Sequence, residues 1–259
     1  MIGLFDSGIG GLTVVREVMK KLPNQSLLYF GDTARTPYGN KSPEVIKQYG
    51  LEATRFLVEH GAKVIVVACN TVSAVGIEAI KEHYPEIEVF DVITPAVQAI
   101  KNLPHAKRIG IMGTRALVNS GIYEKLLNAP GREVVSYPAP LLVPLVEEGW
   151  LNKPETKRII KHYLLPFKQA QVEVLVLACT HYPLVKKLII ARLSKRTKVI
   201  DPAQETAAVV AALVNKQPAL AVSSAKPEHH FFVTDLTVHT QAIAQKWLQR
   251  EVNLEKVNL

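Results

Sequence analysis

The chain has 259 residues, of which 48% are hydrophobic and 21% are charged, and its formal net charge is +8. This length accommodates one large or two small domains, and the composition is that of an ordinary globular protein. No apolar run approaches the ~18 residues that a membrane span needs, and the positive charge comes without zinc-finger spacing or an RNP-like motif, so we expect neither a membrane nor a nucleic-acid partner.

The first residues, MIGLFDSGIGG, lack the basic segment with which a secretory signal begins. We therefore expect a cytoplasmic protein, in a reducing compartment where a structural disulfide is not expected. The densest basic stretch, residues 186–198, interleaves its charges with aliphatic residues at helical spacing, which is typical of the solvated face of a packed helix. A basic surface would also attract a small anionic substrate.

Short β-branched runs alternate with longer segments of helical periodicity along the chain. In chain order, strands are predicted near residues 2–5, 27–30, 64–68, 89–91, 108–112, 134–137, 174–178, 199–200 and 231–233. Helices are predicted over residues 11–22, 43–59, 71–83, 155–169, 183–193, 204–214 and 237–250. Continuously apolar strands are typical of sheets covered by helices on both faces, so the pattern predicts an α/β fold with mainly parallel sheets.

The two cysteines of the chain end two similar apolar runs, VIVVAC at residues 64–69 and VLVLAC at residues 174–179. Four of the six positions are identical and the other two are conservative. The repeat predicts two similar α/β units, each with a thiol at the carboxyl end of a strand. Open α/β sheets bind their ligands at that edge.

Polar residues follow each cysteine at once, in ACNT at residues 68–71 and ACTH at residues 178–181. A helix is predicted to begin within a few residues, and its N-terminus is expected to lower the thiol pKa from its usual ~8.5 and to help bind a carboxylate. His181 is a candidate base or proton relay. Simple burial of the cysteines, or a zinc site at Cys69, Cys179 and His181, are the alternatives, although no CxxC or HExxH spacing supports zinc.

Two further polar segments follow the first two predicted strands: FDSGIGG at residues 5–11 and GDTARTPYG at residues 31–39. The first lacks the GxGxxG pattern of a dinucleotide site. Asp6 and Ser7 suit recognition of an amine and a carboxylate, and Tyr38 and Gly39 could line the same pocket. The alternative is that both segments are only loops.

A pair of thiols on opposite sides of a cleft meets the requirement for inverting a stereocentre by proton transfer. One thiolate removes the proton from one face, and the other thiol delivers a proton to the opposite face. Two facing α/β units would supply this symmetry.

The segments FDSGIGGL, GDTARTPYG, ACNT and LACTHYP occur in this order and together resemble the cofactor-independent members of the aspartate/glutamate racemase family, over about residues 2–210. The resemblance implies two α/β domains related by pseudo-twofold symmetry, with the active site in the cleft between them. The first domain would comprise residues 1–92 and 206–259, and the second residues 93–205. Neither pyridoxal phosphate nor a metal is implied, and a homodimer is expected.

By position, the resemblance assigns the acid and base to Cys69 and Cys179, with Asp6 and His181 as their assisting residues. It adds an assisting glutamate in LVPLVEEGW, which we place on Glu147 rather than Glu148. The implied substrate-binding pairs are Asp6–Ser7, Tyr38–Gly39, Asn70–Thr71 and Thr180–His181.

The implied reaction interconverts L-glutamate and D-glutamate and supplies a precursor of peptidoglycan, with the first cysteine acting on the D-enantiomer. The alternatives are a racemase of the same family for aspartate or another amino acid, a hydrolase or decarboxylase that needs only one thiol, and a binding protein of two domains without catalysis.

Overall fold

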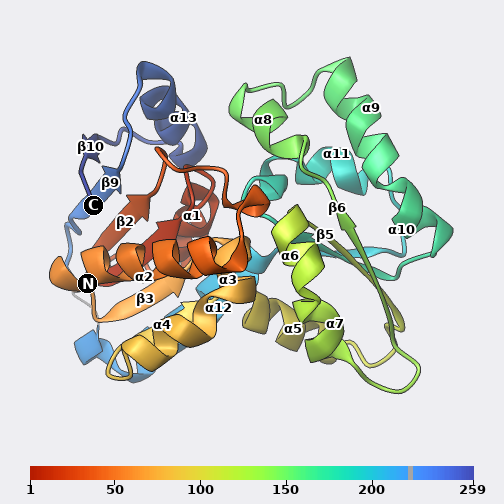
Figure 1. Ribbon diagram of the computed structural model, residues 1–259, viewed down its shortest axis with the longest axis horizontal. Coiled ribbons are helices and arrows are strands. Elements are labelled where there is room, and N and C mark those ends of the chain that lie inside the picture. The colour runs from red at the N-terminus through yellow and green to blue at the C-terminus, as the bar shows by residue number, and fades with distance from the viewer. Residues whose placement is uncertain (221–223) are drawn as a thin grey trace.

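The computed structural model describes residues 1–220 and 224–259, which form two β-sheets flanked by helices (Figure 1). The six-stranded sheet has the order β10-β9-β2-β1-β3-β4, and the four-stranded sheet has the order β6-β5-β7-β8. Neighbouring strands run parallel in both sheets. The predicted α/β fold with mainly parallel sheets is confirmed.

The six-stranded sheet combines the first part of the chain with its C-terminal segment, and both termini lie beside it in Figure 1. Its strands are β1 (Ile2–Asp6), β2 (Leu27–Gly31), β3 (Val64–Val67), β4 (Glu88–Asp91), β9 (His229–Val233) and β10 (Leu254–Lys256). The helices packed on it are α1 (Leu12–Lys21), α2 (Pro43–Glu59), α3 (Asn70–Val75), α4 (Ile77–His83), α12 (Pro202–Lys216) and α13 (Val238–Leu248).

Alternating side chains of the central strands explain why this sheet has helices on both faces. Leu4 and Tyr29 are buried in a core with α1, α12 and α13, whereas Phe5 and Phe30 are buried in a second core with α2, α3 and α4. Successive residues of a strand point to opposite faces, so a run of apolar residues supplies both cores at once.

The four-stranded sheet lies in the middle of the chain. Its strands are β5 (Arg108–Gly113), β6 (Glu133–Pro138), β7 (Val174–Ala178) and β8 (Lys198–Ile200). The helices around it are α5 (Ile93–Lys101), α6 (Arg115–Ser120), α7 (Ile122–Leu127), α8 (Leu142–Glu147), α9 (Pro154–Tyr163), α10 (Leu165–Gln169) and α11 (Lys186–Ile190). Within residues 1–220 and 224–259, no helix is both long enough and apolar enough to cross a membrane.

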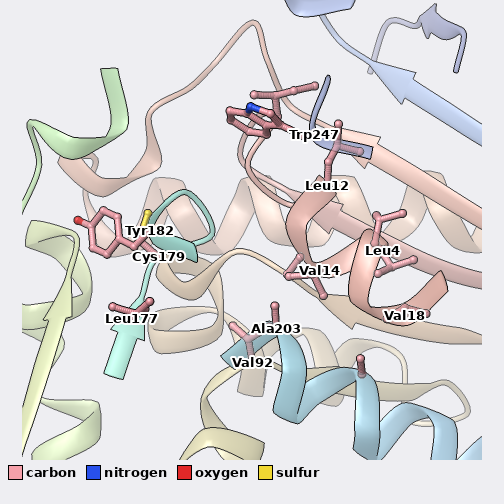
Figure 2. Close-up of a cluster of buried hydrophobic side chains, with 14 of the residues drawn as sticks. Leu4, Leu12, Val14, Val18, Val92, Leu177, Cys179, Tyr182, Ala203 and Trp247 are labelled. Carbon is pink, nitrogen blue, oxygen red and sulfur yellow. The ribbon is translucent and has the colours of Figure 1, made fainter. Parts of the chain in front are cut away.

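One hydrophobic cluster joins the two sheets. It contains Leu4 from β1, Val14 and Val18 from α1, and also Leu177 from β7 and Tyr182. Figure 2 shows these side chains together with Ala203 at the start of α12. The two sheets therefore share a core rather than meeting only at their surfaces.

All nine predicted strands are present, but some helical predictions need correction. The helix predicted over residues 155–169 is two helices, because Pro166 has no N–H to donate to the preceding turn. Residues 71–83 likewise divide at Gly76, and residues 183–193 form a 3₁₀ turn (Tyr182–Val185) followed by α11. Strand β10 and helices α5, α6, α7 and α8 were not predicted.

Candidate active site

A cavity of about 430 Å³ lies between the sheets, where β1, β3 and β7 end. All eleven residues singled out in the sequence line it: Asp6, Ser7, Tyr38, Gly39, Cys69, Asn70, Thr71, Glu147, Cys179, Thr180 and His181. A second cavity, of about 970 Å³, lies at the other end of β5 and β7 and contains neither thiol. The smaller cavity is the candidate active site because it brings the reactive groups together.

Cys69 follows β3 and precedes the first turn of α3, and only 4% of it is exposed. Burial raises the pKa of its thiol to about 12, and the Asp6 carboxylate acts in the same direction. The expected lowering of this pKa by a helix N-terminus is therefore wrong. Helix α3 has only six residues, and its partial charge is outweighed by the loss of water around the sulfur.

Asp6 ends β1 and is 1% exposed. Burial raises its pKa, while His181 and the backbone N–H groups of Gly11, Gly8 and Ser7 act in the opposite direction. The Gly8 N–H donates to Asp6 Oδ2 at 3.1 Å, but Oδ1 is buried without a partner. This carboxylate can therefore accept a hydrogen bond from a bound ligand.

Cys179, His181 and Glu147 form a chain of polar contacts. His181 Nδ1 lies 3.7 Å from Cys179 Sγ, and His181 Nε2 lies 2.9 Å from Glu147 Oε1. Burial alone would lower the pKa of His181, but the hydrogen bonds with Cys179 and Glu147 raise it to about 10. The ring is therefore an imidazolium at neutral pH, a state that stabilises a thiolate beside it. No α-helix starts immediately after Cys179, so His181 takes the place of the helix dipole expected there.

The glutamate beside His181 is Glu147, at the end of α8, and Glu148 does not line the cavity. On its other side, His181 meets the ring of Trp247 from α13 edge-on, with the ring centroids 5.7 Å apart. The histidine of the four-stranded sheet is thus packed against the C-terminal helix of the six-stranded sheet.

Hydroxyl groups link the two sheets next to the cavity. Thr13 donates to the Thr180 carbonyl at 2.8 Å, and the hydroxyls of Thr71 and Thr114 lie 2.9 Å apart. Both hydrogen bonds join elements of different sheets. Asn70 Oδ1 is buried without a partner and, like Asp6 Oδ1, is free to accept from a ligand.

Tyr38 lines the cavity without offering its hydroxyl, which donates to the buried carboxylate of Asp32. Asp32 also accepts from Arg35 Nε at 2.6 Å and from Thr234 Oγ1 at 2.8 Å. This network anchors the loop after β2. Gly39 is required there because a Cβ would lie 2.9 Å from the Cβ of Thr114.

Several residues of the cavity were not found from the sequence. They are Thr36, Pro37, Asn40, Thr114, Arg115, Pro140, Leu141, Val143 and Pro144. Thr114 follows β5 directly and caps α6. Ligands bind at the carboxyl ends of parallel strands, and this rule pointed to Cys179 after β7. The same rule applied to β5 would also have found Thr114.

The described residues contain no group of three or more His, Cys, Asp or Glu side chains placed to hold a metal ion. The zinc alternative therefore has no ligand set in that part of the chain. Both cysteines are free and buried.

The two parallel sheets share a core, and one strand of each sheet ends at a thiol that lines a common cavity. These features define an α/β protein with a two-thiol site. The family comparison agrees: the model of the Asp/Glu/Hydantoin racemase family matches residues 12–210. The chain belongs to this racemase family.

Relatives cover nearly the whole chain. A glutamate racemase from Geobacter metallireducens is 41% identical over 249 residues, which are 95% of this chain and 92% of the relative. A crystal structure of glutamate racemase from Francisella tularensis in complex with D-glutamate superposes with a TM-score of 0.92 at 37% identity, covering 99% of this chain and 97% of the other. An aspartate racemase from Picrophilus torridus shares the fold, with a TM-score of 0.55 at 19% identity, covering 86% of this chain and 95% of the other.

Proposed function

We propose that this racemase interconverts L-glutamate and D-glutamate by a two-base mechanism in which Cys69 and Cys179 are the acid and the base. The observation that carries the proposal is the pair of buried thiols on one cavity, each with its own ionisable neighbour: Asp6 for Cys69 and His181 for Cys179. The glutamate racemases that resemble the chain over nearly its whole length support the choice of substrate.

The polar groups of the cavity suit an amino acid. Asp6 Oδ1 and Asn70 Oδ1 are buried acceptors without partners, and an ammonium group would satisfy both. The hydroxyls of Ser7, Thr71 and Thr180 are donors for carboxylate oxygens. The α-carbon then lies between the thiols, with the charged groups of the substrate fixed around it.

The groups beside the two thiols suit one direction of reaction in the free protein. Cys69 is a neutral thiol, because burial raises its pKa to about 12, whereas Cys179 lies beside the His181 imidazolium. In our proposal the Cys179 thiolate takes the α-proton of L-glutamate and the Cys69 thiol protonates the opposite face. Cys69 is then the thiolate and Cys179 the thiol, so the enzyme is set for the D-enantiomer.

The carbanion that forms between these steps is difficult to stabilise, because the α-proton of an amino acid is only weakly acidic. Fixed donors in a site that excludes water must carry that stabilisation. The cavity provides this setting, since Cys69, Asn70, Thr71, Thr180 and His181 are all buried.

The test is to incubate the purified protein with L-glutamate in deuterium oxide, without added cofactor. Decay of the circular dichroism signal to zero, with deuterium at the α-carbon and no bond cleavage, is the expected result. Cleavage products would identify the single-thiol hydrolase or decarboxylase, and turnover of L-aspartate in place of L-glutamate would identify the other racemase. No turnover of either would favour a binding protein.

Supply of D-glutamate for peptidoglycan, a cytoplasmic location and a homodimer are parts of the same proposal. Light scattering in solution tests the homodimer. We also propose that the chain has two domains, the first formed by residues 1–92 and 206–259 and the second by residues 93–205. Because α12 begins at Pro202, a boundary before this residue would keep the helix whole.

A further inference from the structure

The larger cavity, of about 970 Å³, has no part in the proposed reaction. The first residue of each of β5, β7 and β8 lines it, so it lies at the amino ends of these strands, whereas Cys179 follows the carboxyl end of β7. Figure 1 shows α10, which ends at this cavity, on the side of the four-stranded sheet away from the other sheet.

The lysines, arginines and carboxylates of this lining are very unequal in number. Five are basic and one is acidic, and they are Arg108, Lys168, Arg192, Arg196, Lys198 and Glu173. In the whole chain the corresponding numbers are 31 and 23, so the basic composition of the protein does not account for the excess. We call this site the basic cavity.

The single carboxylate of the basic cavity, Glu173, does not neutralise it. Glu173 Oε2 accepts hydrogen bonds from the backbone N–H groups of Lys107 and Arg108, at 2.7 and 2.9 Å. Its Oε1 lies 3.7 Å from the guanidinium of Arg108. Glu173 therefore offsets the charge of one arginine, and four cations of the lining have no acidic partner within residues 1–220 and 224–259.

Three of these four cations have no polar partner at all. Arg192 donates to the Leu188 carbonyl at 2.9 Å and so stabilises the end of α11. The side chains of Lys168, Arg196 and Lys198 are exposed and make no hydrogen bond or ion pair in the part of the chain that the structure describes. These three charges are available to a ligand.

The basic stretch noted in the sequence, residues 186–198, supplies three of the five cations. It was expected to form the solvated face of a packed helix, but α11 ends at Ile190, and these three cations lie beyond it. The segment after the helix is held by Thr197, whose hydroxyl donates to the Val172 carbonyl at 3.0 Å. The charges of this half of the stretch therefore border a cavity rather than a helix face.

The walls between the charges are apolar. They consist of buried side chains and two half-buried leucines: Phe167, Val172, Val174, Leu103 and Leu193. A cleft that is lined by charge of one sign and has walls of low dielectric constant focuses the field and concentrates counter-ions. Repulsion between the cations also destabilises the free protein, and an anion bound among them would relieve that repulsion.

We propose that the basic cavity binds a compound with a diphosphate group, at a site separate from the active site. A phosphate group carries about 1.5 to 2 negative charges at pH 7, so two linked phosphates match Lys168, Arg196 and Lys198 better than a carboxylate does. Arginine and lysine both bind phosphate, and arginine does so through two parallel hydrogen bonds. The cavity is large enough to accept an organic group next to the diphosphate. This inference does not depend on the proposed function.

Calorimetric titration with inorganic pyrophosphate, in the absence of metal ions, tests the site. We expect the wild type to bind one equivalent. In the double variant Arg196→Gln with Lys198→Gln the dissociation constant should rise at least about 10-fold, because two charge-assisted contacts are lost. Circular dichroism and the melting temperature should match those of the wild type, since both side chains are exposed and unpaired.

Arg158→Gln with Lys161→Gln is the matched control. It also removes one arginine and one lysine, from exposed positions on α9 that line neither cavity, so the dissociation constant should change much less. An equal loss in the two double variants would show a response to net charge alone and overturn the inference. So would a wild type that does not bind pyrophosphate, or a dissociation constant that rises with the concentration of L-glutamate, since this would place the anion in the active site.

Titrations with ADP and adenosine distinguish the sources of the diphosphate. Tighter binding of ADP than of pyrophosphate would identify an organic diphosphate as the ligand. Equal or weaker binding of ADP would mean that the cavity recognises the diphosphate group alone. If adenosine bound as tightly as ADP, the cations would play no part in recognition, and the inference would be overturned.

Discussion

The two thiols differ in their immediate surroundings even though their strands are similar in sequence. Cys69 is next to a carboxylate, Asp6, and burial leaves it a thiol with a pKa of about 12. Cys179 is next to the imidazolium of His181, which Glu147 holds from the other side. The two thiols are therefore distinguished in the free protein by the charges beside them rather than by residue type.

Replacing either thiol should stop the reaction in both directions, because each direction needs an acid and a base. We expect Cys69→Ala and Cys179→Ala to lower kcat for both enantiomers at least about 1000-fold. Serine should be almost as damaging, since a hydroxyl is a far poorer base near neutral pH. Circular dichroism from each pure enantiomer measures this, and near-wild-type turnover by either alanine variant would exclude the two-thiol mechanism.

The neighbours of the thiols should act asymmetrically. His181 contacts Cys179, so His181→Asn should change the isotope effect with α-deuterated substrate more for one enantiomer than for the other. Asp6→Asn, beside Cys69, should show the opposite bias. The kcat/KM values of the two directions must stay equal, because the enantiomers have equal free energies in water. Equal isotope effects in both variants would show that these residues do not serve separate faces.

The same histidine should make stability depend on pH. The pKa of His181 is about 10 in the folded chain, above the value of 6.5 that we take for the unfolded chain. The contribution of the charged ring to the free energy of unfolding is therefore fully present below pH 6.5 and is lost as pH rises through 10. We expect the difference in free energy of unfolding between wild type and His181→Asn to shrink over this window, by at most about 1.4 kcal/mol per pH unit. Urea titrations from pH 6 to 8.5 measure it. A difference that grows with pH would mean that His181 is neutral in the folded protein.

At the residue scale, sequence motifs picked out side chains that share one cavity, but not their protonation states. All eleven candidates line one cavity because polar residues after parallel strands collect at one edge. The direction of the Cys69 pKa was predicted wrongly, because burial by distant segments is not visible in the local sequence. Arg115 was missed because a single arginine in a helical segment has no motif around it.

At the scale of elements, the loops that connect strands to helices must pass very close to one another. The loop between β1 and α1 touches the loop after β7 at Gly10. A Cβ at this position would lie 2.5 Å from His181 Cε1 and would also overlap the Thr180 hydroxyl. The backbone of Gly10 does not have a positive φ, so its conformation does not require glycine. Glycine is required at this position because the two loops pass so close to each other.

Gly10→Ala should therefore displace His181 and Thr180 without removing any reactive group. We expect kcat/KM to fall about 10- to 100-fold, because small displacements of catalytic groups are costly. Gly8→Ala in the same loop is the control: its Cβ would lie 3.1 Å from the Oγ1 of an exposed Thr36, which can move, so its loss should be smaller. Equal effects of the two substitutions would mean that the loop as a whole, rather than its contact with His181, controls activity.

Strands were easier to predict than helices, for a physical reason. Buried parallel strands are apolar on both faces, as in residues 64–67 and 174–178, and such runs stand out in a sequence. Helices α6, α7 and α8 have only six residues each, which is under two turns and too short for a clear helical period. Tertiary contacts, such as the Thr114 cap and the packing of Val146, stabilise them instead.

At the scale of the whole molecule, the shared core couples two sheets that the sequence repeat had suggested as separate units. Leu177 of β7 and Val14 of α1 belong to the same cluster (Figure 2). Helix α12 packs against both α1 and α5. The C-terminal helix α13 adds Trp247, in contact with His181. Disruption of either sheet would expose apolar surface of the other.

The two sheets should consequently unfold in one transition. The chain has two tryptophans, Trp150 beside the four-stranded sheet and Trp247 on α13 of the other, so each sheet carries its own fluorescent reporter. In Trp150→Phe and Trp247→Phe, urea curves followed by the remaining tryptophan should coincide with those from far-ultraviolet circular dichroism of the same variant, as a two-state transition requires. We expect a single transition because the shared cluster buries apolar side chains of both sheets. When either sheet unfolds, the other loses the stabilisation that this burial provides. If fluorescence and circular dichroism gave separate midpoints in either variant, the cluster would not couple the sheets, and each would be an independent folding unit.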